Sequence, residues 1–242
     1  MTHSRNTMET HKKTHRFENP FRVLRQLLNG KSIARSLFNL AIERYEMKGK
    51  VLDLGSKNGA SSYYQHIKRA DDCHITFTDL VPGPDVVQVD VEKPFPFPDC
   101  SFDTVISFHL MEHVYDFWKM PSEIHRVLKP GGRVIVSVPF IHEFHGDPGD
   151  YWRMSDDAVI RLFQSSGFKL SQVETLGEGV ATFAAIKVGG LLLPKSLKPI
   201  GLCLGYLFGM AVDRVVRLIR YRDKASSYAK NFCYDVIAEF VK

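Results

Sequence analysis

The residues best suited to chemistry in this chain are a glycine-containing turn and three acids that end apolar or β-rich runs. The turn lies in Val51–Gly59, VLDLGSKNG, where an apolar run containing Asp53 leads into two glycines. Asp79 and Asp90 follow two later β-rich runs. Glycine lets backbone N–H groups approach a ligand closely, and carboxylates accept hydrogen bonds from hydroxyl and amino groups. The pattern predicts a nucleotide-type ligand at the edge of a sheet.

The acid at the entrance of the turn favours a ligand that carries positive charge and no phosphate. A dinucleotide dehydrogenase has G-x-G-x-x-G beside a pyrophosphate, and this turn lacks that triplet. S-adenosylmethionine (SAM) has a sulfonium, an ammonium and a ribose, all of which suit carboxylates. The spacing from Gly55 to Asp79 is close to the roughly 20 residues expected for an acid that binds the ribose hydroxyls. Asp90 can accept from the adenine amino group, so we expect SAM as the cofactor.

The run D-x-G-x-x-x-G, Asp53 to Gly59, resembles motif I of the class I SAM-dependent methyltransferases, whose usual form is D-x-G-x-G-x-G. Lys57 replaces the middle glycine, so its side chain must point away from the cofactor or contact its carboxylate. PFPFPDCSFDTVISFHLMEHV (94–114) and LKPGG (128–132) resemble signatures of the type 11 group, and the resemblance covers about residues 51–173. It implies these cofactor-binding residues: Asp53, Gly55, Ser56, Lys57, Gly59, Asp79, Leu80, Asp90, Val91 and His109.

The elements that must position these residues alternate between strands and helices. Residue types and periodicity predict strands at 51–54, 74–78, 85–89, 102–108, 133–138, 168–176 and 231–241. They predict helices at 60–69, about 117–128, and 156–165 capped by Ser155. Two further helices begin at Asn19-Pro20 and after Ser32, the second covering one edge of the sheet. The resemblance implies an α/β, Rossmann-like sheet of seven mostly parallel strands in the order 3-2-1-4-5-7-6, with strand 7 antiparallel and helices on both faces.

A second group of functional side chains follows the fifth predicted strand, in residues 141–155. It resembles the H–P–DYWR–(S/T) segment of a type 11 subgroup, with matching residues His145, Pro148, Asp150, Tyr151, Trp152, Arg153 and Ser155. As an acceptor-binding loop it would offer His145 or Asp150 as general base, and Tyr151, Trp152, Arg153 and His113 as substrate contacts. In the alternative, Asp150 pairs with Arg153 and Trp152 fills the core. The sequence leaves both interpretations open.

Residues 180–228 form a helical, basic and apolar insert between the sixth and seventh strands, too long to be a structureless loop. Gly201, Gly205 and Gly209 recur every four residues, so they line one helix face and permit close packing, within the chain or between subunits. An apolar stripe of Val212, Val215, Val216 and Ile219 opposite arginines is typical of a helix in a membrane surface. Residues 189–224 are therefore predicted to contact an anionic membrane, a second subunit or the chain's own sheet.

Charge and composition bound the remaining possibilities. Residues 1–35 and residues 187–224 each contain eight Lys and Arg but only two acidic residues. Residues 36–186 contain 14 Lys and Arg and 21 acidic residues, so the middle of the 242-residue chain is acidic and both flanks are basic. We expect a disordered basic tail at 1–18, a SAM-binding domain at 19–179 with 229–242, and the insert at 180–228. Basic flanks suit an anionic partner, but nucleic acid is not expected because no N-P-P-Y-type loop follows the fourth strand.

The four cysteines have no metal-type spacing, and the N-terminus has no apolar signal segment. We therefore expect reduced thiols, no metal and a cytoplasmic protein, with membrane association left open. The predicted function is SAM-dependent methyl transfer to a small-molecule, glycan or lipid-linked acceptor. The alternative is a non-catalytic binding or scaffold protein with the SAM fold, attached to a membrane or partner through the insert.

Overall fold

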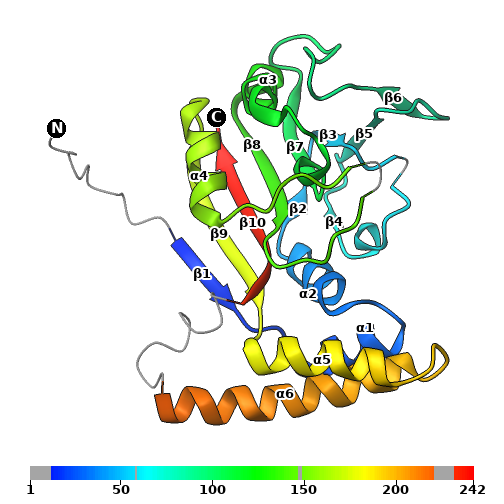
Figure 1. Ribbon diagram of the computed structural model, residues 1–242. Coiled ribbons are helices and arrows are strands. Elements are labelled where there is room, and N and C mark those ends of the chain that lie inside the picture. The colour runs from blue at the N-terminus through cyan, green and yellow to red at the C-terminus, as the bar shows by residue number, and fades with distance from the viewer. Residues whose placement is uncertain (1–11, 58, 147–148, 221–231) are drawn as a thin grey trace, which may run out of the picture.

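The computed structural model describes residues 12–57, 59–146, 149–220 and 232–242. Within these residues, an eight-stranded sheet runs in the order β1-β9-β10-β8-β7-β3-β5-β6 (Figure 1). Two further two-residue strands, β2 (Glu46–Met47) and β4 (Lys68–Arg69), pair with each other. The strands of the main sheet are β1 (Lys12–Arg16), β3 (Lys50–Leu54), β5 (His74–Asp79), β6 (Val86–Gln88), β7 (Phe102–Phe108), β8 (Leu128–Pro139), β9 (Lys169–Gly177) and β10 (Cys233–Val241).

The predicted strand order is confirmed from β6 to β9. β10 is antiparallel to both β8 and β9, and the other pairs of the main sheet are parallel. The prediction of a disordered tail at 1–18 is wrong for Lys12–Arg16, which extend the sheet as β1 beside β9. A polar segment can occupy a sheet edge because its backbone groups, rather than an apolar pattern, make the pairing. Residues 1–11 lie outside the described part of the chain.

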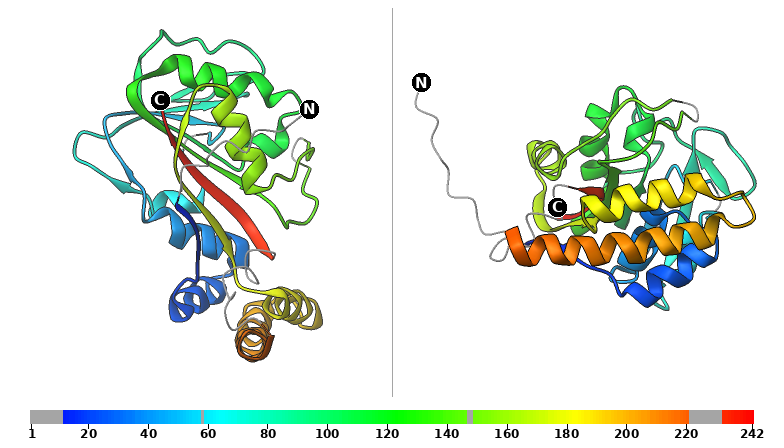
Figure 2. Two further views of the ribbon diagram at one scale, coloured as in Figure 1. Left: turned by 90° about the vertical axis from the view of Figure 1, so that its left-hand side faces the viewer. Right: turned by 60° about the horizontal axis from the view of Figure 1, so that its bottom comes forward.

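Successive side chains of each strand point to opposite faces of the sheet, and each face packs into its own hydrophobic core. On one face, Leu52 and Leu54 pack with residues of α3 (Met120–Val127) and α4 (Asp156–Ser165). On the other face, Val51 packs with residues of α1 (Pro20–Leu28) and α2 (Ile33–Ile42). Helices thus cover both faces, as predicted (Figure 2). α2 lies against a face of the sheet and not its edge, because most of its residues are buried.

The predicted helix ends at Asn19, Ser32 and Ser155 are confirmed. Their side-chain oxygens accept from the backbone N–H groups of Phe21, Arg35 and Ala158 respectively. These contacts satisfy donors that would otherwise lack a partner in the first turn of each helix.

The helix predicted at 60–69 is wrong. A short 3-10 helix, η1 (Ser62–Gln65), is followed by β4. Serine and tyrosine have weak helix propensity, and Tyr63 and Tyr64 are buried against the rings of Phe38, Phe108 and Phe77. Packing of two consecutive aromatic residues therefore decides the local structure here.

The insert is a hairpin of two antiparallel helices, α5 (Val180–Leu192) and α6 (Lys198–Arg220), which lie side by side below β9 and against α1 (Figures 1 and 2). A Cβ at Gly201, Gly205 or Gly209 would come within 2.2, 2.4 or 2.3 Å of the backbone of α5. The predicted close packing is therefore present inside the chain. The predicted use of this glycine face by a second subunit is contradicted, because α5 already covers it.

The side chain of Asp213 in α6 caps the N-terminus of α5. Its carboxylate accepts from Ala181 N at 3.0 Å, Thr182 N at 2.8 Å and Thr182 Oγ1 at 2.6 Å. Gly179 at the helix start has no side chain to cap it, so the neighbouring helix supplies the acceptor. In the described part of the chain, neither α6 nor any other helix has the length and apolar character needed to cross a bilayer.

Candidate active site

The glycine corner joins β3 to η1 in a shape that only glycine permits at its first position. Gly55 has φ +76°, and a Cβ there would lie 2.6 Å from Leu110 Cδ1. The N–H groups of Gly55 and Ser56 donate to Thr78 O at 3.0 and 3.2 Å, which ties the corner to β5. Lys57 has φ +57° and an exposed side chain, so it does not fill the turn. Asn58 lies outside the described residues.

Parallel pairing brings the three predicted acids to the carboxyl ends of neighbouring strands. Asp53 pairs in register with Phe77 on β5, and Asp79 pairs with Gln88 on β6, two residues before Asp90. In an open α/β sheet this edge is where ligands bind. The predicted arrangement of acids from three neighbouring strands is therefore present.

The three acids have different surroundings. Asp53 is fully buried, neither of its oxygens makes a hydrogen bond of good geometry, and burial raises its pKa well above the ordinary value. Asp79 is half-buried, and its Oδ1 accepts from Val81 N at 3.1 Å. Asp90 pairs with Lys93 at 2.8 Å, which lowers its pKa. Leu80 is 56% exposed beside Asp79, whereas Val91 belongs to the core. Leu80 is thus the predicted apolar contact that remains open to a ligand.

His109 directly follows β7, has φ +51° and lies beside two buried carboxyl groups. Its Nδ1 lies 3.7 Å from Glu112 Oε1 and 3.9 Å from Asp235 Oδ1, and its Nε2 is buried without a partner. Burial, followed by the nearby Arg35, lowers the pKa of His109 well below its ordinary value. The imidazole is therefore neutral.

Asp235 and Glu112 lie at the same edge beside His109, and sequence reasoning missed both of them. Both are almost completely buried, and none of their carboxylate oxygens has a hydrogen-bond partner in the described structure. Burial raises the pKa of Asp235 to about 7 and that of Glu112 to about 8. An acid inside an otherwise apolar strand was the signal for Asp235, since a buried carboxyl group without a partner is costly. For Glu112 the signal was its place beside the end of a buried strand.

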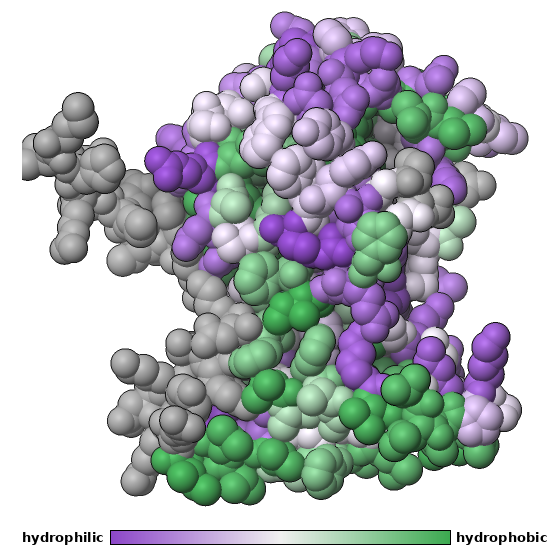
Figure 3. Space-filling model, viewed as in Figure 1, coloured by the Kyte–Doolittle hydropathy of each residue, from purple (hydrophilic) through white to green (hydrophobic). Residues whose placement is uncertain are grey.

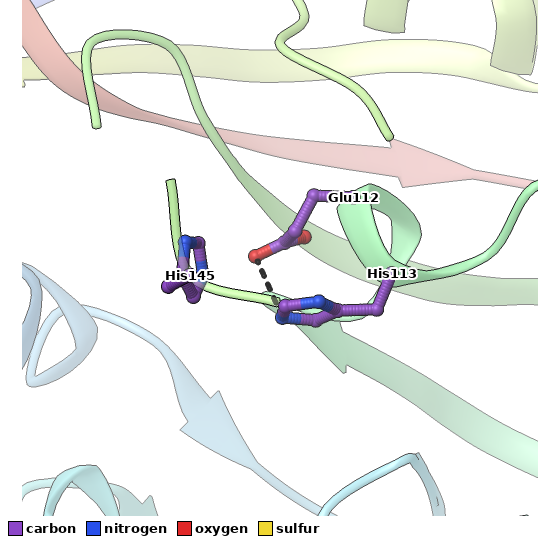
Figure 4. A group of neighbouring side chains, drawn as sticks. All are labelled: Glu112, His113 and His145. Atoms are coloured by element: carbon purple, nitrogen blue, oxygen red, sulfur yellow. Dashed lines mark ion pairs between the residues drawn. The ribbon is translucent and has the colours of Figure 1, made fainter. Parts of the chain in front are cut away.

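Glu112, His113 and His145 lie together at this edge (Figure 4). His113 Nε2 is 3.9 Å from Glu112 Oε1, and the rings of His113 and His145 are 4.9 Å apart and nearly perpendicular. Tyr151 N donates to Glu112 O at 2.7 Å, so the loop after β8 is fastened over this group. The structure thus brings the predicted substrate residue His113 and the predicted base His145 together.

In the loop after β8, the structural alternative holds for Asp150, Trp152 and Arg153. Arg153 donates to both oxygens of Asp150, with Nη2–Oδ2 at 2.7 Å, and holds the pKa of Asp150 well below its usual range. Asp150 is therefore not a general base. Arg153 also donates to the carbonyls of Trp152 and Glu143, so it is not free as an anion clamp.

The two predicted aromatic contacts differ in exposure. Trp152 packs on the core and donates from Nε1 to Val114 O at 3.1 Å. Tyr151 is 53% exposed, and its ring lies edge-on to that of Tyr115. Pro148 lies outside the described residues.

A cavity of about 480 Å³ lies between the domain and the hairpin, and the sequence did not indicate it. Glu143, from the loop that carries His145, lies at this cavity and pairs with Lys187 of α5 at 2.6 Å. The remaining lining combines basic and apolar residues. They are Gly30, Ser32, Ile33, Ile186, Gly190, Leu191, Lys195, Lys198, Pro199 and Leu202.

Comparison with known proteins places the central strands in one family. The model of the type 11 methyltransferase domain matches residues 52–136. A Mycolicibacterium smegmatis protein named a probable S-adenosylmethionine-dependent methyltransferase is 48% identical over 88 residues, 34% of this chain and 34% of that protein. A ubiquinone/menaquinone biosynthesis C-methyltransferase of Geotalea daltonii is 31% identical over 120 residues, 46% of this chain and 43% of that protein. The chain thus covers less than half the length of either relative.

Solved structures share the fold. A SAM-dependent methyltransferase from Archaeoglobus fulgidus aligns with a TM-score of 0.52 at 14% identity, over 93% of this chain and 100% of that one. The [4+2]-cyclase SpnF aligns with a TM-score of 0.51 at 17% identity, over 87% of this chain and 80% of that one. The family match thus covers β3 to β8, about a third of the chain, and the solved structures show that the same fold extends over most of the rest.

Proposed function

We propose that this chain binds SAM and transfers its methyl group to an acceptor held beneath the loop after β8. The observation that carries this proposal is the alignment of Asp53 and Asp79 on neighbouring strand ends around a bare glycine corner. The corner offers close approach without the phosphate-binding triplet of a dinucleotide site. The methyl carbon would pass to the acceptor nucleophile as its bond to sulfur breaks, leaving neutral S-adenosylhomocysteine.

The side chains would act mainly by positioning, because the sulfonium is already an electrophile. Asp79 would accept from the ribose hydroxyls, with exposed Leu80 beside the adenine. His109, whose side chain is partly exposed, would lie near the methionine end. His145 Nδ1 lies 3.0 Å from Glu143 O, which leaves Nε2 as an acceptor for the proton of a hydroxyl group. In this role His145 would be the general base.

The cavity beside the hairpin favours an acceptor with both an anionic and an apolar part. Lys195 and Lys198 line it together with Ile186 and Leu202. Lysine binds phosphate and carboxylate groups as a point charge, and the apolar lining suits a hydrocarbon or ring. A lipid-linked or glycan acceptor carrying a phosphate has this combination of chemistry.

Methyl transfer is tested by the release of S-adenosylhomocysteine from SAM over a panel of lipid-linked, glycan and small-molecule acceptors. Turnover with at least one acceptor, lost in Asp79→Ala, is expected. With a hydroxyl acceptor, the rate of methyl transfer should fall strongly in His145→Ala. With a carboxylate acceptor the rate should be retained, because a carboxylate needs no general base. Absence of SAM binding would contradict the proposal for every acceptor.

We also propose that the hairpin rests on an anionic membrane surface. Exposed apolar side chains follow one helical stripe of α6 at Ile200, Leu204, Leu207, Phe208, Val215, Leu218 and Ile219. Figure 3 shows apolar residues gathered along this end of the molecule. Phe208, Leu218 and Ile219 are 68%, 73% and 80% exposed, and the basic residues Lys195, Lys198 and Arg214 lie on the same two helices or their connection. An apolar stripe bordered by basic residues suits the interface of an anionic bilayer.

Flotation with vesicles of phosphatidylserine and phosphatidylcholine tests the membrane proposal. The full chain should float with these vesicles, and Phe208→Asp combined with Leu218→Asp should abolish flotation. Val87→Asp, a similar change at an exposed position on the far edge of the sheet, should float normally. Equal flotation of all three proteins, or none by the unmodified chain, would contradict the proposal.

A second candidate is a non-catalytic binding or scaffold protein. The observation that favours it is Lys57 at the position of the middle motif I glycine, where it holds a left-handed conformation. A [4+2]-cyclase shares the fold, so the fold by itself does not fix methyl transfer. Bound SAM without turnover over the whole acceptor panel would favour this candidate.

A further inference from the structure

Glu112, His113 and His145 converge on one point at the carboxyl edge of the sheet. One ligand-type atom from each lies within 4.8 Å of the other two (Figure 4). Glu112 and His113 come from the turn after β7, and His145 comes from the loop after β8. Two parts of the chain more than thirty residues apart therefore supply the cluster.

Hydrogen bonds fix how both imidazoles present their nitrogens. His113 Nδ1 contacts Gly149 O, and His145 Nδ1 lies 3.0 Å from Glu143 O. A carbonyl oxygen only accepts, so in each ring Nδ1 must carry the proton and donate it. Nε2 of each ring is then left with a lone pair. A histidine held in this way by a carbonyl is the usual arrangement of a metal ligand and its supporting contact.

Glu112 is the third member of the cluster, and its carboxyl group makes no hydrogen bond in the described structure. Its side chain is 1% exposed. A buried carboxyl group without a partner is strongly unfavourable. A cation placed between Glu112 Oε1 and the two Nε2 atoms would supply the missing partner.

We propose that Glu112, His113 and His145 bind a divalent transition-metal ion, of which Zn²⁺ suits the donors best and Mn²⁺ serves as a spectroscopic probe. Two imidazoles and one carboxylate form a three-ligand set that leaves coordination positions open, as in catalytic metal sites. Ligand atoms bound to Zn²⁺ at about 2.0–2.1 Å lie about 3.3 Å apart in tetrahedral geometry. Glu112 Oε1 and His113 Nε2 are 3.9 Å apart. A side-chain movement of less than about 1 Å would therefore bring these two atoms to the ligand–ligand distance of a zinc site.

The function proposed for the ion depends on the proposed methyl transfer. In a chain that has bound the ion, the ion activates the acceptor and His145 does not act as the general base. An acceptor hydroxyl bound at an open position loses its proton to solvent more readily, because the ion stabilises the oxyanion. The oxygen then attacks the methyl carbon, and the carbon–sulfur bond breaks with its electron pair going to sulfur. The ion is neither oxidised nor consumed. His145 cannot accept that proton while its Nε2 binds the ion.

Metal binding is measured directly on the chelator-treated full chain, with Mn²⁺ by electron paramagnetic resonance and Zn²⁺ by calorimetry. One site per chain is expected, with at least tenfold weaker binding in Glu112→Gln and in His145→Ala. His142→Ala is the matched control, because its ring lies 4.5 Å from that of His145 and outside the cluster. Its affinity should equal that of the unmodified chain.

Two results would overturn the metal site. One is the absence of a site for either ion at millimolar concentration, and the other is equal affinity in Glu112→Gln, His145→Ala and His142→Ala. Thermal melts of each variant show whether it is folded, and Glu112→Gln keeps the size of the side chain. SAM binding is measured in the same samples. Loss of SAM binding with metal binding intact would defeat the methyl-transfer proposal alone, and the converse would defeat the metal site alone.

Discussion

Asp150 and Arg153 show how one side chain can change the role of its neighbour. In sequence the two residues resemble an acceptor-binding pair, but in the structure Arg153 donates its hydrogen bonds to Asp150. Asp150 also accepts from His145 N at 2.9 Å, so the pair holds the backbone that carries His145. The role of this pair is therefore to position the loop.

Replacement of Asp150 by asparagine should lower the free energy of unfolding by about 1–3 kcal/mol, because a buried hydrogen bond to a charged group is lost. Arg153→Met should cost a similar amount, and the double variant should cost less than the sum, since the two side chains are coupled. Urea unfolding of the four proteins measures this. Strict additivity would show that the two side chains are not coupled in the folded protein.

Sequence alone located the residues that end strands and missed those that meet only in three dimensions. Gly55 and Asp79 follow apolar runs, so the pattern places them at the edge of a parallel sheet. Asp235 reaches the same edge through an antiparallel strand almost two hundred residues from Asp53. The preference of Asp150 for Arg153 over a substrate depends on loop packing, which no local pattern encodes.

At the scale of elements, the hairpin depends on the close approach of α5 and α6. Gly205→Val should lower the thermal midpoint by several degrees, because the new Cβ would start 2.4 Å from Ala185 O, a backbone atom. Leu204→Val on the exposed face of the same helix is the control and should have little effect. Calorimetric melts check both. Equal midpoints would mean that the helices do not pack as described.

The junction between the domain and the hairpin should also be sensitive to pH. Glu178 is 4% exposed and accepts from Tyr206 Oη at 3.2 Å. Burial raises the pKa of Glu178 to about 7. The folded state therefore holds this proton more tightly than the unfolded state. Its contribution to stability is complete below about pH 4.5 and is lost as pH rises through about 7.

Glu178→Gln should remove this dependence. Relative to the variant, the unmodified protein should lose up to about 3 kcal/mol between pH 5 and pH 8, since each pKa unit corresponds to about 1.4 kcal/mol. Urea unfolding at both pH values, with the difference taken between the two proteins, isolates the contribution of Glu178. Parallel pH profiles would show that the carboxyl group is not protonated when folded.

Helices and strands were largely predictable where the spacing of apolar residues and the capping residues indicated the same element. Ser155 with α4 and the apolar run of β7 are examples, because burial and local propensity favour the same structure there. η1 departs from the prediction because the packing of Tyr63 and Tyr64 outweighs helix periodicity. β1 carries no apolar signal, since its pairing uses only backbone groups at the sheet edge.

At the scale of the molecule, the exposed stripe of α6, the cavity beside it and the loop with His145 lie on connected elements. Glu143 of this loop pairs with Lys187 of the hairpin, at the cavity. A lipid-linked acceptor drawn from the membrane could thus enter the cavity near the site. Lys195 and Lys198 lie at the junction of α5 and α6, where they would meet the phosphate groups of the bilayer.

Membrane association should therefore weaken with salt and with charge removal. Raising the salt concentration from 0.05 to 0.5 M should reduce flotation with anionic vesicles, because the basic residues lie at a screened surface. Lys195→Gln with Lys198→Gln should reduce both the binding and its salt dependence. Flotation that is identical at both salt concentrations would show that charge takes no part.

The central claim is that SAM lies across the carboxyl ends of β3 and β5, with Asp79 on its ribose. Calorimetric titration of the full chain with SAM measures this most directly. Binding is expected at one site, at least tenfold weaker in Asp79→Ala, and unchanged in Asp72→Ala, an exposed acid near the opposite end of β5. No binding of SAM, or equal affinity in all three proteins, would contradict the account.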